Sequence, residues 1–385
     1  MAEPFKNFIN AEGVQAAAQH LARAWPDFEA AGFTAAVVPQ LEALELKARA
    51  MCVADALELF LPADFLAAAP IIERALAQAE ARSGQMVTAA IPGGLAGWFC
   101  WPVGEFVARR GLPHPDRALH CLREITKRFT AEFAIRPFVQ EYPALVFETL
   151  AAWVNDPDEH VRRLVSEGTR PRLPWGMQLR ALVADPSPTL PLLEALLDDP
   201  SDYVRRSVAN HLNDISRDHP DVVADFIERH LDHVSAERRA LLRHASRTLV
   251  KRGHARTLHA WGRGAPFEGT VELQLSPASI RMGERLQLEV VLASHADRDQ
   301  PVTVDYIVHH VKRDGLHSPK VFKGWQATVR SGEPAVLRRT HHVKPITTRR
   351  YYGGVHRVDV QVNGVVCATA EFVLVLSPSI IPPAG

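Results

Sequence analysis

Several common signals are scarce or missing in this sequence. Its 385 residues include four cysteines, and none of them lie close enough together to form a Cys-x-x-Cys pair. This scarcity predicts reduced core thiols in the cytosol at Cys52, Cys100, Cys121 and Cys367. No uninterrupted apolar run approaches the roughly 20 residues of a membrane span. The first six residues lack the apolar stretch of a secretion signal, so we expect a cytoplasmic protein without a membrane anchor.

Net charge and the common catalytic motifs are also missing. Lys+Arg and Asp+Glu both number 44, so any nucleic-acid signal must be local rather than global. There is no Walker loop, no Gly-x-Gly-x-x-Gly after a strand, and no His-Glu-x-x-His. The adjacent pairs His309-His310 and His341-His342 lie on predicted strands, where neighbouring side chains point to opposite faces. We therefore expect no metal site and no cofactor.

The chain from about residue 10 to 262 has a helical pattern. Apolar residues recur at three- and four-residue spacing, for example at Leu119, Leu122, Ile125 and Phe129. The stretch 91–102 contains Pro-Gly-Gly and is predicted to be an irregular loop. Prolines lie between the periodic segments and predict helix starts or ends at Pro26, Pro39, Pro62, Pro70, Pro143 and Pro220.

One motif occurs twice within this helical part. The segment that begins Asp156-Pro157 and continues to Val165 recurs from Asp199-Pro200, 43 residues further along the chain. An Asp-Pro turn that opens an amphipathic helix at this period is typical of HEAT-type repeats, which recur at roughly 40 to 47 residues. Such repeats stack into a solenoid with a long concave face.

Beyond residue 266 the period changes from helical spacing to alternation. Seven segments in which apolar and polar residues alternate predict short strands over 271–275, 286–292, 302–307, 321–329, 335–343, 355–362 and 365–376. Seven such strands with turns between them indicate an immunoglobulin-like sandwich. We therefore expect a multidomain α-then-β chain. It comprises an all-α HEAT-like repeat solenoid over 1–264, an immunoglobulin-like β-sandwich over 265–377 and a flexible tail over 378–385.

Each copy of the repeat carries two adjacent arginines. Arg162-Arg163 and Arg205-Arg206 lie in the first turns of the predicted helices, away from the apolar face. On one hypothesis they form salt bridges on a solvated surface, which contribute only a few tenths of a kcal/mol each. On the other, the repetition in register forms a strip that contacts DNA phosphates, together with Arg172 in the loop 168–174.

Acidic residues lie among these bases. Glu132, Glu167 and Asp214 each have an arginine within one turn. Simple charge balance is the default explanation. The alternative is catalytic, because a carboxylate near DNA repels phosphate unless it stabilises a cation. Trp175 follows the basic loop and could stack on a base or face a cation, although most tryptophans are core anchors.

A second basic region lies in the predicted sandwich. From Pro334 to Val358 there is no acidic residue, and the same stretch holds a Tyr-Tyr-Gly-Gly turn. Such a run can simply be the solvated edge strand that guards a sheet against aggregation. The length of the acid-free stretch favours contact with nucleic acid instead, through Arg338, Arg339, Lys344, Arg349 and Arg350.

Three segments resemble the AlkC family of bacterial alkylpurine DNA glycosylases. They are 125–138, 158–175 and 212–220, of which the second is long and unusual enough to make the match specific. The resemblance covers nearly the whole chain, since some members carry an immunoglobulin-like domain after HEAT-like repeats. Within these segments the family's active-site residues fall on Glu132, Glu167, Trp175 and Asp214.

The resemblance implies a substrate and a mechanism. The substrate would be duplex DNA with cationic N3-alkylated bases, 3-methyladenine and 3-methylcytosine in particular, excised without base flipping. Alkylation makes the base a good leaving group, and the bond breaks through an oxocarbenium-like transition state. Asp214, with Glu132 or Glu167, would supply negative charge, and one of them would hold the attacking water.

The remaining candidates would position the DNA. Trp175 would pack on the deoxyribose or the lesion, the repeat arginines would hold flanking phosphates, and the sandwich loop would enter the opposite groove. We expect a monomer that associates with the nucleoid when bound to DNA. Two other classes also fit the pattern: a non-catalytic HEAT-like scaffold, and an architectural protein that binds distorted DNA.

Overall fold

The computed structural model describes residues 5–78, 93–232, 234–262, 266–345 and 350–376. The chain divides into two compact units. We call Met1–Asp218 with Ser235–Ala245 the helical unit, and His219–Val234 with Ser246–Gly385 the sandwich unit. The predicted tail over 378–385 and the side chain of Arg349 lie outside the described residues.

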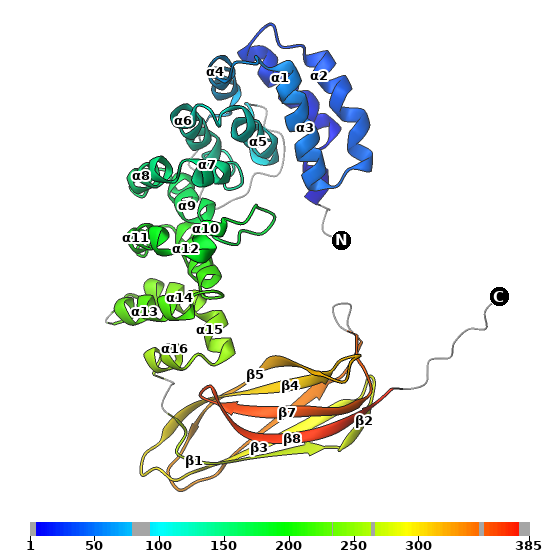
Figure 1. The fold of residues 1–385 in the computed structure, drawn as a ribbon, viewed down its shortest axis with the longest axis vertical. Helices are drawn as coiled ribbons and strands as arrows, with labels where there is room; N and C mark the ends of the chain where they lie inside the picture. Colours follow the sequence, from blue (N-terminus) through cyan, green and yellow to red (C-terminus); the bar gives the residue numbers. More distant parts are fainter. Residues whose placement is uncertain (1–4, 79–92, 233, 263–265, 346–349, 377–385) are drawn as a thin grey trace, which may run out of the picture. The chain divides into compact units, whose positions relative to one another are not determined.

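Helices build the whole described part of the helical unit (Figure 1). Short 3-10 turns separate several of them. Its elements are η1 (Phe5–Phe8), α1 (Ala11–Ala24), α2 (Ala30–Val37), η2 (Val38–Ala43), α3 (Leu46–Phe60), α4 (Phe65–Ala75), η3 (Gly97–Phe99), α5 (Cys100–Arg110), α6 (Pro115–Thr126), α7 (Arg136–Glu141), α8 (Pro143–Trp153), α9 (Glu159–Gly168), α10 (Arg180–Ala184), η4 (Ser187–Thr189), α11 (Leu190–Ala195), α12 (Asp202–Ile215) and α14 (Ala236–Ala245).

The repeated motif forms the same turn twice. Asp156 Oδ1 accepts the amide of Asp158 at 2.9 Å, and Asp199 Oδ1 accepts the amide of Ser201 at 2.8 Å. These Asx turns open α9 and α12, which pack against each other, and α12 in turn packs against α14. The two copies are therefore neighbouring units of one stack, as a repeat requires. Their assignment to the HEAT type stays a prediction.

Three details of the sequence-based prediction are wrong. Pro70 lies inside α4 instead of bounding a helix, because the buried face of α4 holds the helix together across the missing amide bond. The predicted loop over 91–102 includes η3 and the start of α5, where Trp98 and Trp101 are buried. Its first two residues lie outside the described ranges. Cys367 is an exposed thiol on a strand, not a core thiol.

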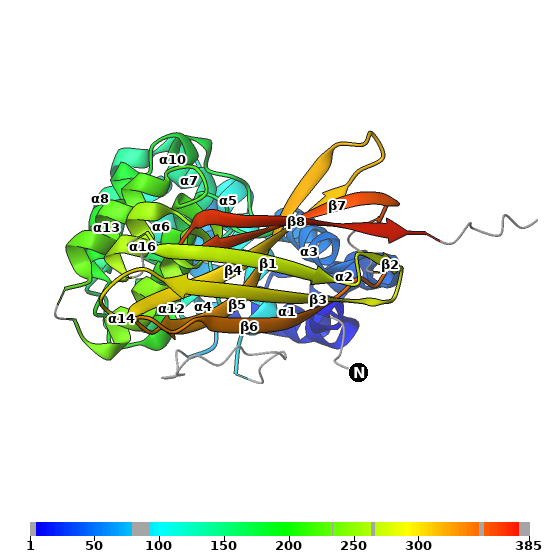
Figure 2. The ribbon, with the colours of Figure 1, turned by 90° about the horizontal axis from the view of Figure 1, so that it is seen from below.

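The sandwich unit begins with helices and ends with two sheets. Its elements are α13 (Pro220–His230), α15 (Arg247–Arg252), α16 (Ala255–Ala260), β1 (Gly269–Ser276), β2 (Ser279–Arg281), β3 (Arg285–Ser294), β4 (Gln300–Val311), β5 (His317–Val329), β6 (Ala335–His342), β7 (Gly354–Val362) and β8 (Val365–Val375). One sheet has the order β1-β3-β6, and the other has the order β2-β8-β7-β4-β5. Figure 2 shows β1, β3 and β6 side by side.

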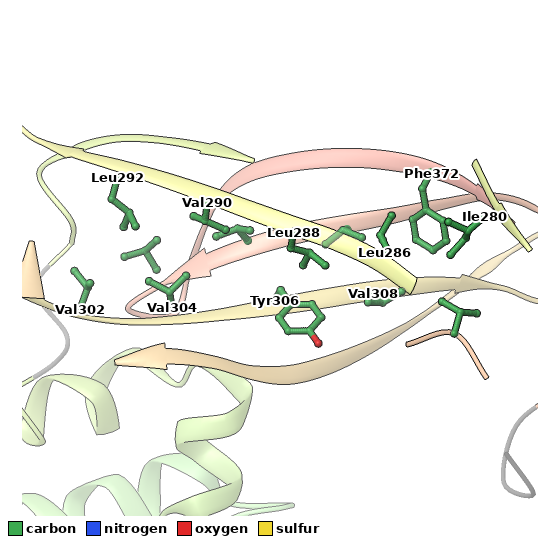
Figure 3. Packing of buried hydrophobic residues seen from close by; sticks show 14 of the residues in the cluster. Ile280, Leu286, Leu288, Val290, Leu292, Val302, Val304, Tyr306, Val308 and Phe372 are labelled. Carbon is green, nitrogen blue, oxygen red and sulfur yellow. The ribbon is translucent and has the colours of Figure 1, made fainter. Parts of the chain in front are cut away.

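Alternation of side chains explains why these strands pack as a sandwich. Leu286, Leu288, Val290 and Leu292 project from one face of β3, and residues from β4, β7 and β8 meet them in one apolar core (Figure 3). Each fully buried aliphatic side chain contributes about 1.5–3 kcal/mol relative to an exposed one. All seven predicted strands are confirmed. The three-residue strand β2 was not predicted, because it is too short to show a period.

The boundary between the predicted domains stays a prediction. The change from helix to strand lies between α16 and β1, close to the predicted division at 264/265. The compact units place α13, α15 and α16 in the same unit as the sheets. No helix in the described ranges is long and apolar enough to cross a membrane.

Candidate active site

A cavity of about 410 Å³ lies in the helical unit. This volume is within the range of ordinary ligand sites. Two kinds of side chain form most of its wall. The charged ones are Glu132, Glu167, Lys127, Arg128, Arg163 and Arg170, and the aromatic ones are Phe5, Trp98, Phe129, Phe133, Trp175 and Tyr203.

Ion pairs join the three predicted carboxylates into one chain. Arg163 donates to Glu132 at 2.9 Å and lies 3.6 Å from Glu167. Arg170 donates to Glu167 at 2.6 Å and to Asp214 at 2.8 Å. The carboxylates come from three places: the turn after α6, the end of α9 and the end of α12. Segments far apart in sequence thus bring Glu132, Glu167 and Asp214 together, with Asp214 buried behind Arg170.

Hydroxyl groups orient two of the carboxylates. Thr130 Oγ1 donates to Glu132 Oε2 at 2.8 Å, and Ser207 Oγ donates to Glu167 Oε2 at 2.5 Å. Both oxygens of Glu167 are therefore occupied. Glu132 receives its two donors on Oε2 alone, and its Oε1 has no hydrogen-bond partner among the described residues. Glu132 lines the cavity, so this oxygen can accept a hydrogen bond from a water molecule.

The same network shifts the carboxyl pKa values in opposite directions. Burial opposes ionisation of Glu167, but Arg163 and Arg170 outweigh it, so the pKa of Glu167 is lowered. Burial also acts on Asp214, and there Arg170, with a smaller contribution from Arg217, does not compensate fully, so the pKa of Asp214 is raised. Glu167 has hydrogen bonds from Arg170 and Ser207 and the charge of Arg163, whereas Asp214 also lies near the negative charge of Glu167, which raises its pKa further.

A buried arginine fixes the loop that carries Trp175. The fully buried Arg136 donates from Nε to the carbonyl of Met177 at 2.7 Å and from Nη1 to the carbonyl of Gly168 at 3.0 Å. Burial, with the charge of nearby Arg170, lowers the pKa of Arg136 to about 10. The guanidinium therefore ties together both ends of the loop between α9 and α10.

Trp175 stands at the exposed part of this loop. Its φ is 64°, in the left-handed region that non-glycine residues seldom adopt, and its side chain is 60% exposed. Its ring lies parallel to that of Trp101, with the ring centroids 6.5 Å apart. A strained backbone held around an exposed aromatic ring is characteristic of binding sites.

The structure separates the two arginines of each repeat pair. Arg162 donates to both oxygens of Asp199 at 2.7 and 3.0 Å, and Arg205 donates to the carbonyls of Asp199 and Pro200. The first arginine of each pair thus stabilises a turn, and these bonds compete with any phosphate contact. The second arginines differ: Arg163 enters the cavity, whereas Arg206 is exposed.

Two other predicted phosphate ligands in the helical unit pair with exposed or half-exposed carboxylates. Arg172 donates to Asp218 at 2.8 and 2.9 Å, and Arg206 donates to Asp202 at 2.6 Å. Exposed pairs of this kind contribute roughly 0–1 kcal/mol, so these arginines can exchange a carboxylate for a phosphate at little cost.

The predicted basic region of the sandwich lies on and after the edge strand β6. Arg338 donates to Glu289 at 2.6 Å, and Arg339 lies over Trp325 at 5.8 Å. Arg350 lies over Tyr352 at 5.7 Å, and Lys344 is exposed. Arg349 lies outside the described residues. All four described cations are exposed, as both the edge-strand and the nucleic-acid hypotheses require.

Several residues of the cavity were not predicted from the sequence. Arg170 could have been found from its position three residues after Glu167, a spacing at which opposite charges commonly pair. His160 and Tyr203 occupy the same position of the two repeats, and their rings lie 5.4 Å apart. Phe5 and Trp98 carried no such signal, because they reach the cavity only through the fold of the N-terminal helices. No group of three or more His, Cys, Asp or Glu in the described parts of the chain could hold a metal ion.

Two protein families match separate parts of this chain. The family described as "DNA alkylation repair enzyme" matches residues 124–249, which include all four predicted active-site residues. The family described as "Uncharacterised protein YhaZ, C-terminal Ig-like domain" matches residues 270–376.

Two similar proteins span almost the full length. The uncharacterized protein YhaZ of Bacillus subtilis (strain 168) is 34% identical over 379 residues, which cover 95% of this chain and 98% of that protein. The structure of Pseudomonas fluorescens alkylpurine DNA glycosylase AlkC, bound to DNA containing an abasic site analog, has a TM-score of 0.80 at 35% identity. That match covers 97% of this chain and all of that one.

Proposed function

We infer a substrate and a mechanism from one premise: the chain belongs to the family of YhaZ and AlkC and is a DNA glycosylase. The predicted resemblance and the predicted order of a helical part followed by an immunoglobulin-like sandwich are thereby confirmed. The substrate, on our proposal, is duplex DNA that carries cationic N3-alkylated bases, 3-methyladenine and 3-methylcytosine. The reaction is hydrolysis of the N-glycosidic bond without flipping of the base.

The observation that carries this proposal is the chain of ion pairs from Glu132 to Asp214. Cleavage moves positive charge from the alkylated base to the deoxyribose. Fixed carboxylates stabilise that developing charge better than water can, because they need no reorganisation during the reaction. The lowered pKa of Glu167 keeps it ionised at neutral pH, which suits charge stabilisation and not proton donation. A cationic base needs no proton donor to leave.

The geometry favours Glu132 as the residue that holds the attacking water. Its Oε1 is free in the described structure while Oε2 is held by Thr130 and Arg163, so one oxygen fixes the side chain and the other can accept. Glu167 and the more deeply buried Asp214 then supply negative charge that stabilises the cationic deoxyribose. Arg163 and Arg170 hold all three carboxylates in place.

Trp175 and the exposed cations account for DNA contact in this proposal. The outward ring of Trp175 packs on the deoxyribose or the lesion without enclosing it, which fits excision from an unflipped nucleotide. Arg172 and Arg206 contact flanking phosphates, and the basic region of the sandwich supplies further contacts through Arg338, Arg339, Lys344, Arg349 and Arg350.

Release of free base tests the proposal. The protein is incubated with methylated duplex DNA and, separately, with a duplex that contains one 3-methylcytosine, and free bases are separated and quantified. We expect 3-methyladenine from the first substrate and 3-methylcytosine from the second, with no base released from unmethylated DNA. Retention of DNA without release would instead indicate an architectural protein, and neither binding nor release would indicate a scaffold.

A further inference from the structure

An exposed aromatic side chain borders the cavity at the N-terminal end of the described chain. Phe5 is 53% exposed and lines the cavity together with Trp98, and their ring centroids are 6.0 Å apart. Trp98 continues this layer inward to Phe129, at 5.0 Å between centroids. The cavity thus has an aromatic part and a carboxylate part that come from different segments.

The turn that carries Phe5 is firmly held. The buried Arg49 donates from Nη1 to the carbonyls of Lys6 and Ile9, both at 2.9 Å. Lys6 also pairs with Glu45 at 2.8 Å. These bonds tie η1 to the start of α3 and fix the backbone around Phe5. Its exposure is therefore a fixed feature of the cavity, unlike that of a loose chain end.

The ring beneath Phe5 belongs to a buried tryptophan whose polar group is unsatisfied within the described part of the chain. Trp98 is buried and stacks on Phe8 at 5.6 Å with an interplanar angle of 9°. Its indole N–H is buried and has no hydrogen-bond partner among the described residues. A phenylalanine at this position would avoid that unsatisfied donor. Tryptophan also offers a stronger π surface for a cation than phenylalanine does.

We propose that Phe5, supported by Trp98, presents the face of its ring to the charged edge of the alkylated base, a contact that an unflipped base can make. This inference rests on the proposed function and assigns the base to the aromatic part of the cavity and the sugar to the carboxylates. Four cations of the cavity are matched by four carboxylates, through the pairs of Lys127 and Arg128 with Glu124 and those of the Glu132–Asp214 chain. The aromatic faces therefore offer the cationic base an attractive surface separate from the carboxylates that stabilise the sugar.

The movement of charge during the reaction gives this inference a kinetic signature. When the C1′–N bond breaks, its electron pair goes to the base, which becomes neutral, while C1′ becomes cationic and takes up water with loss of a proton. Phe5 therefore attracts the bound lesion more strongly than the departing base. An interaction of this kind lowers the half-saturating concentration and leaves the rate of the chemical step unchanged or slightly slower.

Single-turnover excision from a 3-methylcytosine duplex tests this signature. In Phe5→Ala we expect the half-saturating enzyme concentration to rise roughly 5- to 20-fold, with the maximal rate retained. Phe5→Leu keeps an apolar side chain but lacks the π face, and we expect it to resemble Phe5→Ala. Leu66→Ala removes a similarly exposed apolar side chain from α4 and serves as the matched control, with wild-type kinetics expected.

Binding to a duplex with an abasic site separates base contact from general DNA contact. Because that duplex has no base at the lesion, we expect Phe5→Ala to bind it as tightly as the wild type. An equal loss of affinity for both duplexes, or an unchanged half-saturating concentration in Phe5→Ala, overturns the inference while the proposed function stands. Absence of base release by the wild type overturns both.

Discussion

The carboxylate network of the helical unit and the predicted basic region of the sandwich unit hold their arginines in different surroundings. In the helical unit, the side chains of Arg163 and Arg170 are 17% and 10% exposed, and both bridge pairs of carboxylates. In the sandwich unit, the core is largely aliphatic, and the side chain of Arg338 is 73% exposed. The same residue type is thus part of a buried network in one unit and a solvated surface charge in the other.

This contrast separates catalysis from affinity. Breaking a buried ion pair costs about 3–5 kcal/mol, because the remaining charge stays buried without a partner. An exposed pair contributes about 0–1 kcal/mol and can be exchanged for another anion. We therefore expect substitutions in the helical network to affect stability and the chemical step, and those in the sandwich to affect only salt-dependent DNA affinity.

The largest effect is expected from Arg170→Met. This change leaves Glu167 and Asp214 buried without their shared cation, so we expect the free energy of unfolding to fall by about 3–5 kcal/mol. Urea unfolding of both proteins at pH 7 measures this difference in the free energy of unfolding. Arg206→Met is the matched control, since that arginine pairs with Asp202 at the surface and should cost no more than about 1 kcal/mol. If both variants lost the same free energy of unfolding, burial of the ion pairs would not be the cause of the destabilisation.

A loss of rate without loss of binding is expected from Asp214→Asn and Glu132→Gln. Each removes negative charge that stabilises the transition state, and we expect excision to slow by about 10²- to 10³-fold. Single-turnover kinetics measure the rate, and affinity for an abasic duplex should stay near the wild-type value. Asp202→Asn, a surface carboxylate, is the control. Should either variant merely bind DNA more weakly at an unchanged rate, the catalytic assignment fails.

The raised pKa of Asp214 also predicts the acidic limb of the rate profile. If the ionised carboxylate is required, the rate falls as pH drops through a pKa above the ordinary aspartate value of 3.8. In Asp214→Asn the low residual rate should lose this part of its pH dependence. A profile of log rate against pH for both proteins provides the measurement. An acidic limb that is the same in both would assign it to another group.

A smaller effect concerns stability and involves His211. This histidine is fully buried, and burial lowers its pKa from 6.5 to about 3. Below pH 6.5 the unfolded chain takes up a proton that the folded chain does not, so stability falls by up to about 1.4 kcal/mol per pH unit as pH decreases. Unfolding between pH 6.5 and 5 should show a shallower slope in His211→Gln than in the wild type. The lowered pKa of Glu167 affects the pH dependence of stability only as pH falls toward the ordinary glutamate pKa of 4.5, so this range from pH 6.5 to 5 mainly reports His211.

The architecture was predictable because a helix or strand that buries one face has apolar residues at a regular spacing in its sequence. Alternation along β3 or β7 is visible without any partner strand, whereas β2 is too short to show it. The site residues followed from the repeated motif and from the resemblance. The different roles of Arg162 and Arg163 could not be predicted, because they depend on tertiary contacts. Arg162 pairs with Asp199 of the next repeat, whereas Arg163 pairs with Glu132 in the turn after α6.

The smallest effect, and the one that tests the sandwich, is expected from the double substitution Arg338→Ala with Arg350→Ala. Each phosphate contact that is lost should reduce the slope of log affinity against log salt by about 0.9, with little change in thermal stability because both side chains are exposed. Titration of lesion duplex at several salt concentrations measures the slope. Arg330→Ala is the control: that arginine is equally exposed and pairs with Glu333 in the turn between β5 and β6, outside the predicted basic region. An unchanged slope in the double variant would remove this surface from the DNA interface and leave the helical unit to bind the duplex without it.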